Sequence, residues 1–106
     1  MAFSGNFMCT SFKTELLKGV HNFTAASNVF KLAMYTNSAS FNAATTAYTS
    51  SNEVSGTNYT AKGNAITTVT PTSSSTTAFV DMDNVVFTNV TLTGVRGALI
   101  FNEAAS

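Results

Sequence analysis

The sequence predicts a mainly β protein, a small antiparallel β-sandwich or barrel of about six to eight short strands with one short N-terminal helix. Three observations support this fold class. The chain is rich in Thr, Val and aromatic residues, with nine Phe and three Tyr, and such residues favour strands. Clusters of Asn, Ser and Gly separate short apolar runs. The length of 106 residues fits a single domain.

We divide the chain into an N-terminal arm (residues 1–10), one β-rich domain (11–102) and a C-terminal tail (103–106). The arm has no helical or strand periodicity, yet it is apolar. Its large apolar side chains are Phe3, Phe7 and Met8. A terminal segment of this kind packs across its own domain or docks on a neighbouring molecule, and we expect it to contact a partner.

One helix is predicted over about residues 11–19. Ser11 can cap its N-terminus, and Phe12 and Leu16 share one face at a spacing of four residues. Gly19 stands where a helix ends. Two turns of helix are not stable alone in water, so packing must hold this helix.

The clearest strand is "VFKLAMYT", residues 29–36, whose apolar and polar residues alternate. The alternation places Phe30, Leu32 and Met34 on one face. Two further short strands are expected near Thr46–Thr49 and Tyr59–Ala61, and a tight turn at Lys62–Asn64.

The segments 65–72 and 76–82 predict a hairpin joined by a serine-rich turn. Its expected apolar contacts come from Ile66, Val69, Phe79 and Val80. Pro71 lacks an N–H and marks a strand end or an edge. A further stretch, residues 84–94, continues the β pattern with Val86, Val90 and Leu92.

The last strand is Arg96–Phe101. Its run Ala98–Phe101 is continuously apolar, which indicates that both faces are covered, one by the core and the other by the helix or a neighbouring subunit. Gly94 and Gly97 fit a bend or bulge. Arg96, the only arginine, is expected to pair with a carboxylate: Asp81, Asp83 or an acid of a partner.

Charge excludes several function classes. Five basic residues balance five acidic ones, and only 9% of the residues are charged. A nucleic-acid binder carries a basic patch, and a membrane-surface helix is basic on one side, so we expect neither partner. Near-zero net charge promotes association, which predicts that the chain is part of an assembly.

Cys9 has no second cysteine for an internal disulfide, so we expect it to be a buried small apolar residue. No apolar stretch is long enough to cross a membrane as a helix, and the first residues do not resemble a secretion signal.

No motif predicts an enzyme, a metal site or a cofactor. His21 has no nucleophile or acid at motif spacing, and we interpret it as a capping or packing residue. Asp81 and Asp83 are two residues apart, as in a calcium loop, but Val85 occupies the third ligand position, so a turn is favoured.

The tyrosines leave two alternatives open. Tyr35, Tyr48 and Tyr59 could form an aromatic sugar-binding surface or pack along a strand face or a subunit boundary. We favour packing.

Several segments in order carry a family resemblance: "SFKTELLKGVHNF", "FKLAMYT", "NEVSGTNYTAKG" and "RGALIFN". Together they make the chain similar to small virion structural proteins of tailed bacteriophages, over about Phe12 to Asn102. The resemblance implies a β-rich particle protein without enzymatic activity, made in the host cytoplasm.

Among positions on the particle, the resemblance favours a head decoration (cement) protein, because such proteins are short, single-domain and usually homotrimeric. The expected partners are the major capsid protein and further copies of the chain, on the capsid surface of the virion. Phe3, Phe7, Met8 and Arg96 are the expected partner contacts. The alternative is a tail or fibre component that binds host-surface glycan.

Overall fold

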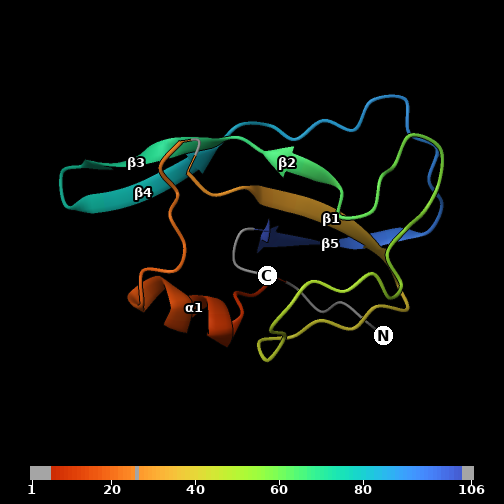
Figure 1. Cartoon of the computed structure of the whole chain (residues 1–106), viewed down its shortest axis with the longest axis horizontal. Helices are drawn as coiled ribbons and strands as arrows, with labels where there is room; N and C mark the ends of the chain where they lie inside the picture. The colour runs from red at the N-terminus through yellow and green to blue at the C-terminus, as the bar shows by residue number, and fades with distance from the viewer. Residues whose placement is uncertain (1–5, 26, 104–106) are drawn as a thin grey trace.

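The computed structural model describes residues 6–25 and 27–103 and contains one helix and five strands (Figure 1). In chain order these are α1 (Thr10–Leu17), β1 (Phe30–Thr36), β2 (Asn64–Ile66), β3 (Thr68–Ser74), β4 (Thr77–Met82) and β5 (Val95–Asn102). The predicted mainly β fold is confirmed. The described chain contains five strands, fewer than the six to eight expected. They form two separate antiparallel sheets, so the described chain contains no closed barrel.

β1 is the central strand of the larger sheet, whose order is β2-β1-β5. Phe30 lies opposite Ile66 of β2 and Asn102 of β5, so both neighbours are antiparallel to β1. The prediction of a β1 face formed by Phe30, Leu32 and Met34 is only partly right. Ala33 and Tyr35, on the other face, are fully buried, because the loop after β1 folds back over them.

That loop supplies the rest of the hydrophobic core. Ala39 and Phe41 pack with Ala33, Tyr35 and Phe101 in one cluster, and Phe41 meets the Tyr35 ring edge-on at 4.7 Å. Tyr48 stacks on Phe101 with ring centroids 4.8 Å apart. The core therefore joins β1, β5 and a loop without regular structure.

The predicted hairpin is confirmed as β3 and β4, and it extends beyond the end of the larger sheet (Figure 1). The expected first strand breaks at Thr67, which separates β2 from β3. Pro71 lies at a register shift between Val69 and Thr72, a position where its missing N–H costs no ladder hydrogen bond.

The hairpin does not make the apolar contacts expected of it, because it projects from the domain. Val69, Phe79 and Val80 are 44%, 46% and 38% exposed, and of the predicted contact residues Ile66 alone is buried. The two-stranded sheet therefore presents apolar side chains to its surroundings.

Three other predicted strands are absent from the described chain: those at Thr46–Thr49, at Tyr59–Ala61 and within residues 84–94. In residues 84–94, hydrogen bonds from side chains take the place of strand pairing. The Asn58 amide donates to the Asn89 carbonyl at 2.9 Å, and the Asn64 amide to the Val86 carbonyl at 2.9 Å. Thr57 and Thr91 form an isolated bridge. These segments are ordered by contacts between distant loops, which strand periodicity does not report.

α1 begins at Thr10 with Cys9 as N-cap, and no side chain caps it, so the prediction of a Ser11 cap is wrong. Ser11 lies in the first turn and donates to the Thr45 carbonyl at 3.3 Å. The predicted end is confirmed, since Gly19 follows the helix with φ +75°. No helix of the described chain is long and apolar enough to cross a membrane.

The predicted turn before β2 is also confirmed. Gly63 has φ +72°, and a Cβ there would lie 1.8 Å from the Leu32 carbonyl oxygen. Lys62 takes φ +77°, a conformation unusual for a residue with a side chain. Its N–H donates to the Glu53 carboxylate at 2.8 Å, which holds this backbone in place.

Candidate interaction surface

The described part of the N-terminal arm presents apolar side chains to the outside. Phe7 is 43% and Met8 52% exposed, although both precede a helix that is anchored to the domain. The anchor is the Thr10 N–H, which donates to the Ala43 carbonyl at 2.8 Å. Cys9 is half-buried and its thiol faces the Asn42 carbonyl at 3.8 Å, so it is less buried than expected. Phe3 and residues 104–106 lie outside the described residues.

Phe7 and Met8 line a cavity of about 600 Å³. The other wall is β5, from which seven consecutive residues, 96–102, contribute. Successive side chains of a strand point to opposite faces, so a cavity that touches every one of them runs along the strand's edge. That edge is open, because β5 ends the order β2-β1-β5 and no other described strand pairs with it.

The cavity lining is mostly apolar, with Asn6 and Asn102 as its polar neutral residues and a single charge. Its remaining large side chains are Phe12, Phe23, Phe30, Phe41, Met82, Leu99, Ile100 and Phe101. Phe23 and Phe30 stack with ring centroids 4.4 Å apart at one end. The one charged lining residue is Arg96. Arg96 therefore lies in one surface with the arm residues Phe7 and Met8, and these are three of the four residues expected as partner contacts.

The predicted intramolecular pairing of Arg96 is wrong. Within residues 6–25 and 27–103, the Lys31–Glu103 ion pair and the His21–Glu15 hydrogen bond do not involve Arg96. Arg96 is exposed in a bulge: Tyr35 lies opposite Gly97 and Thr36 opposite Val95, which leaves Arg96 as the extra residue. The bulge predicted near Gly97 is thus confirmed. Of the carboxylates predicted to pair with Arg96, only an acid of a partner molecule remains.

β5 is covered on one face and not on both. On one face Phe101 is buried and Leu99 packs against the core, whereas on the other face Ala98 and Ile100 are exposed, Ile100 at 53%, and the buried residue is Asn102 at the strand's end. α1 does not cover the strand's outer face, since no residue of α1 is buried and Leu17 is 91% exposed. The apolar run Ala98–Phe101 therefore keeps an apolar surface that the described chain leaves open.

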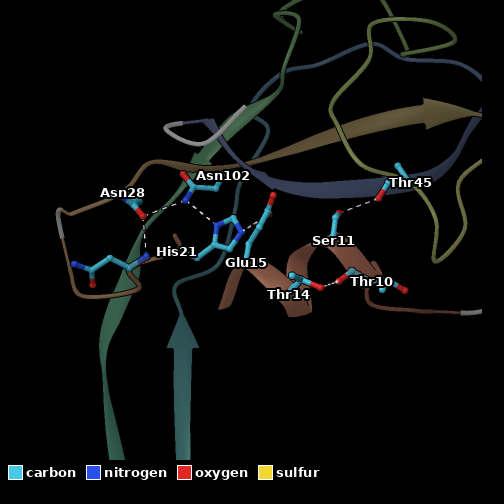
Figure 2. Close-up of polar contacts among 9 residues, drawn as sticks. Thr10, Ser11, Thr14, Glu15, His21, Asn28, Thr45 and Asn102 are labelled. Carbon is cyan, nitrogen blue, oxygen red and sulfur yellow. Dashed lines mark hydrogen bonds and ion pairs between the residues drawn. The ribbon is translucent and has the colours of Figure 1, made fainter. Parts of the chain in front are cut away.

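His21 ties α1 to the end of β5, as Figure 2 shows. Its Nε2 lies 2.9 Å from the Glu15 carboxylate, and its Nδ1 lies 3.0 Å from the Asn102 amide nitrogen. That amide also donates to the Asn28 side-chain oxygen at 3.1 Å. Since the amide nitrogen is a donor, Nδ1 accepts and Nε2–H donates. Both ring nitrogens are occupied, which agrees with a packing residue.

Close to this network, Lys31 contacts Glu103 at 2.7 Å, and the hydrogen bond from Lys31 lowers the pKa of the Glu103 carboxyl.

Among residues 6–25 and 27–103, no group of three or more His, Cys, Asp or Glu side chains is placed to hold a metal ion. Asp81 instead accepts a hydrogen bond from the Met82 N–H at 2.8 Å.

The three tyrosines surround one carboxylate that the sequence analysis missed. Tyr48 and Tyr59 both donate to Glu53, the latter at 2.6 Å. Tyr35 donates to the Thr49 carbonyl at 2.6 Å. The three hydroxyl groups are therefore bonded within the domain, which agrees with packing, and Tyr59 also stacks on Phe87. The sequence does contain a signal for this role of Glu53, because it is the only acidic residue between Glu15 and Asp81.

The tyrosine cluster predicts alkaline unfolding. Burial first, and then the hydrogen bond to Glu53, raises the pKa of Tyr48 to about 12. Burial also raises the pKa values of Tyr35 and Tyr59 well above their usual range. In the unfolded chain tyrosine ionises near pH ~10. Above that pH the unfolded state holds fewer protons, so stability falls as pH rises, by up to about 4 kcal/mol per pH unit for three tyrosines.

Tyrosinate absorbance measures this directly, because the chain has no Trp. In the native protein we expect the absorbance to appear only near or above pH ~12 and together with loss of the β circular dichroism signal. In urea, where the chain is unfolded, the tyrosine hydroxyl groups should ionise at pH ~10. Native titration near pH ~10 with the fold intact would show that the hydroxyl groups are accessible and contradict the cluster.

Comparison of the chain with protein-family models, with curated proteins and with solved structures finds no match.

Proposed function

We propose that the protein is a virion structural protein of a tailed bacteriophage, and that within the particle it is a capsid decoration (cement) protein. It binds the assembled head lattice as a homo-oligomer, a trimer, and its partner on the lattice is the major capsid protein. No catalytic step is part of this function.

The observation that carries the proposal is the exposed apolar surface of the arm, formed by Phe7 and Met8 beside the cavity along β5. Exposed apolar side chains at the rim of a cavity are typical of a protein–protein contact. The surface lies at the anchored base of the N-terminal arm, so an arm that grips a neighbouring subunit would start from a fixed point.

The mechanism is binding linkage. A protein that binds the assembled lattice, and not the free capsid subunit, stabilises the lattice by the free energy of that binding. The low charge of the chain suits repeated side-by-side packing, since like-charged copies would repel one another.

The test is the location and copy number of the protein in purified particles, by microscopy and quantitative mass analysis. A decoration protein is expected in hundreds of copies on the head surface. A handful of copies, or density confined to the tail, would support the tail alternative instead.

A further inference from the structure

Two open strand edges of the chain carry complementary features. β5 exposes its edge with Arg96, and β4 exposes a second edge, because it pairs only with β3. All six residues of β4 except Met82 are exposed, including Phe79 at 46% and Val80 at 38%. Asp81, also exposed, makes no ion pair within the described residues.

We infer that β4 of one copy adds to the open edge of β5 of the next copy as an antiparallel strand, with Asp81 opposite Arg96. The inference deepens the homo-oligomer of the proposed function and concerns the contact between copies, without involving the capsid. Long, open, apolar strand edges are sites where another chain pairs, and main-chain hydrogen bonds supply the attraction.

The register set by the charge pair also matches the side chains by size. It places Gly97 opposite Val80, Ala98 opposite Phe79 and Leu99 opposite Ala78. Each pair joins a small residue to a large one, so side chains directly opposite each other fit without crowding. The antiparallel register then ends with Ile100 opposite Thr77, so it spans nearly the whole length of β4.

A second copy of β5 fits this edge less well. β5 contains no acidic residue, so self-pairing would leave Arg96 without a carboxylate. Among the five strands of the described residues, β4 is the one that combines exposed apolar side chains with an acid. Because β5 and β4 are different surfaces, the contact is heterologous and builds a closed ring when the rotation between copies closes. A ring agrees with the proposed trimer.

Charge reversal tests the pairing in the purified protein alone, by sedimentation velocity. The wild-type protein should sediment as a closed oligomer. R96D and D81R should each sediment as monomers at the same concentration, and the double variant R96D/D81R should assemble again. Asp83→Arg is the matched control, since it makes the same change in charge two residues away and should assemble normally. Circular dichroism checks that each variant folds.

A wild-type protein that stays monomeric at every concentration overturns the inference, as does assembly of both single variants. A double variant that remains monomeric while folded overturns the direct pair. None of these outcomes depends on capsid binding, which the copy number in particles tests separately.

Cross-linking tests the register. In a Cys9→Ser background, Phe79→Cys chains mixed with Ala98→Cys chains should form a disulfide-linked heterodimer under mild oxidation. Each chain alone is the control and should form no more linked dimer than Cys9→Ser itself. Equal linking in the mixture and in the separate chains would contradict the register.

Discussion

Replacement of Glu53 by alanine is expected to unfold the protein or leave it marginally stable. The carboxylate accepts hydrogen bonds from Tyr48, Tyr59 and the Lys62 N–H, and alanine leaves all three donors unsatisfied. The three donors are part-buried, and each costs about 1–3 kcal/mol when it is left unsatisfied, so the total is about 5 kcal/mol. That is comparable with the whole stability of a small domain, about 5–15 kcal/mol. Urea unfolding followed by circular dichroism measures it.

Asp83→Ala is the matched control for Glu53→Ala. Asp83 is exposed and carries the same charge, so its loss should change the free energy of unfolding by about 0.5 kcal/mol or less. If Glu53→Ala were no more destabilising than this control, the carboxylate would not be the centre that holds the loop, β1 and the turn before β2.

The second large effect concerns the capsid. We expect the double variant F7S/M8S to lose binding to heads while its fold stays intact, because both side chains are exposed in the free protein. Burial of each side chain against a partner contributes about 2 kcal/mol, so their joint loss lowers affinity roughly 10³-fold. Co-sedimentation with heads that lack the protein measures this.

Leu17→Ser is the control for the arm variant. Among the residues that the structure describes, Leu17 is the most exposed large apolar one, at 91%, and it lies outside the cavity lining. Its replacement should leave head binding unchanged. Substitution is a sharper test than deletion of residues 1–10, since Thr10 begins α1 and anchors it to Ala43. Unchanged binding of F7S/M8S would remove the arm from the contact.

Local signals in the sequence predicted the elements that are locally determined. The alternation in residues 29–36 gives β1, the serine-rich turn joins β3 to β4, and Gly19 ends α1. The bulge beside Gly97 was also predicted, because a glycine before a continuous apolar run favours one. In each case the deciding residues lie within a few positions of one another.

The sequence could not predict elements that depend on distant contacts. Residues 84–94 have a strand-like composition, yet side-chain amides from Asn58 and Asn64 bind this loop and replace a sheet partner. The hairpin looked buried because its residues are apolar, but it projects from the domain. Periodicity reports which residues share a face and not whether another layer covers that face.

The candidate surface was predicted in part. The sequence indicated these residues separately: Phe7 and Met8 because they are large apolar residues in an arm without periodicity, and Arg96 because it is the only arginine. Their convergence on one cavity depends on the path of the chain across β5, which only the fold reveals. The intramolecular partner expected for Arg96 was wrong for the same reason: β4 and β5 belong to different sheets and do not pair with each other.

The most direct test of the account is the number and position of copies in intact particles, determined by high-resolution microscopy with mass analysis of the same sample. The account predicts hundreds of copies in regular positions on the outer surface of the head, with Phe7 and Met8 against the capsid subunit. Absence from the head, or a few copies on the tail, would contradict it.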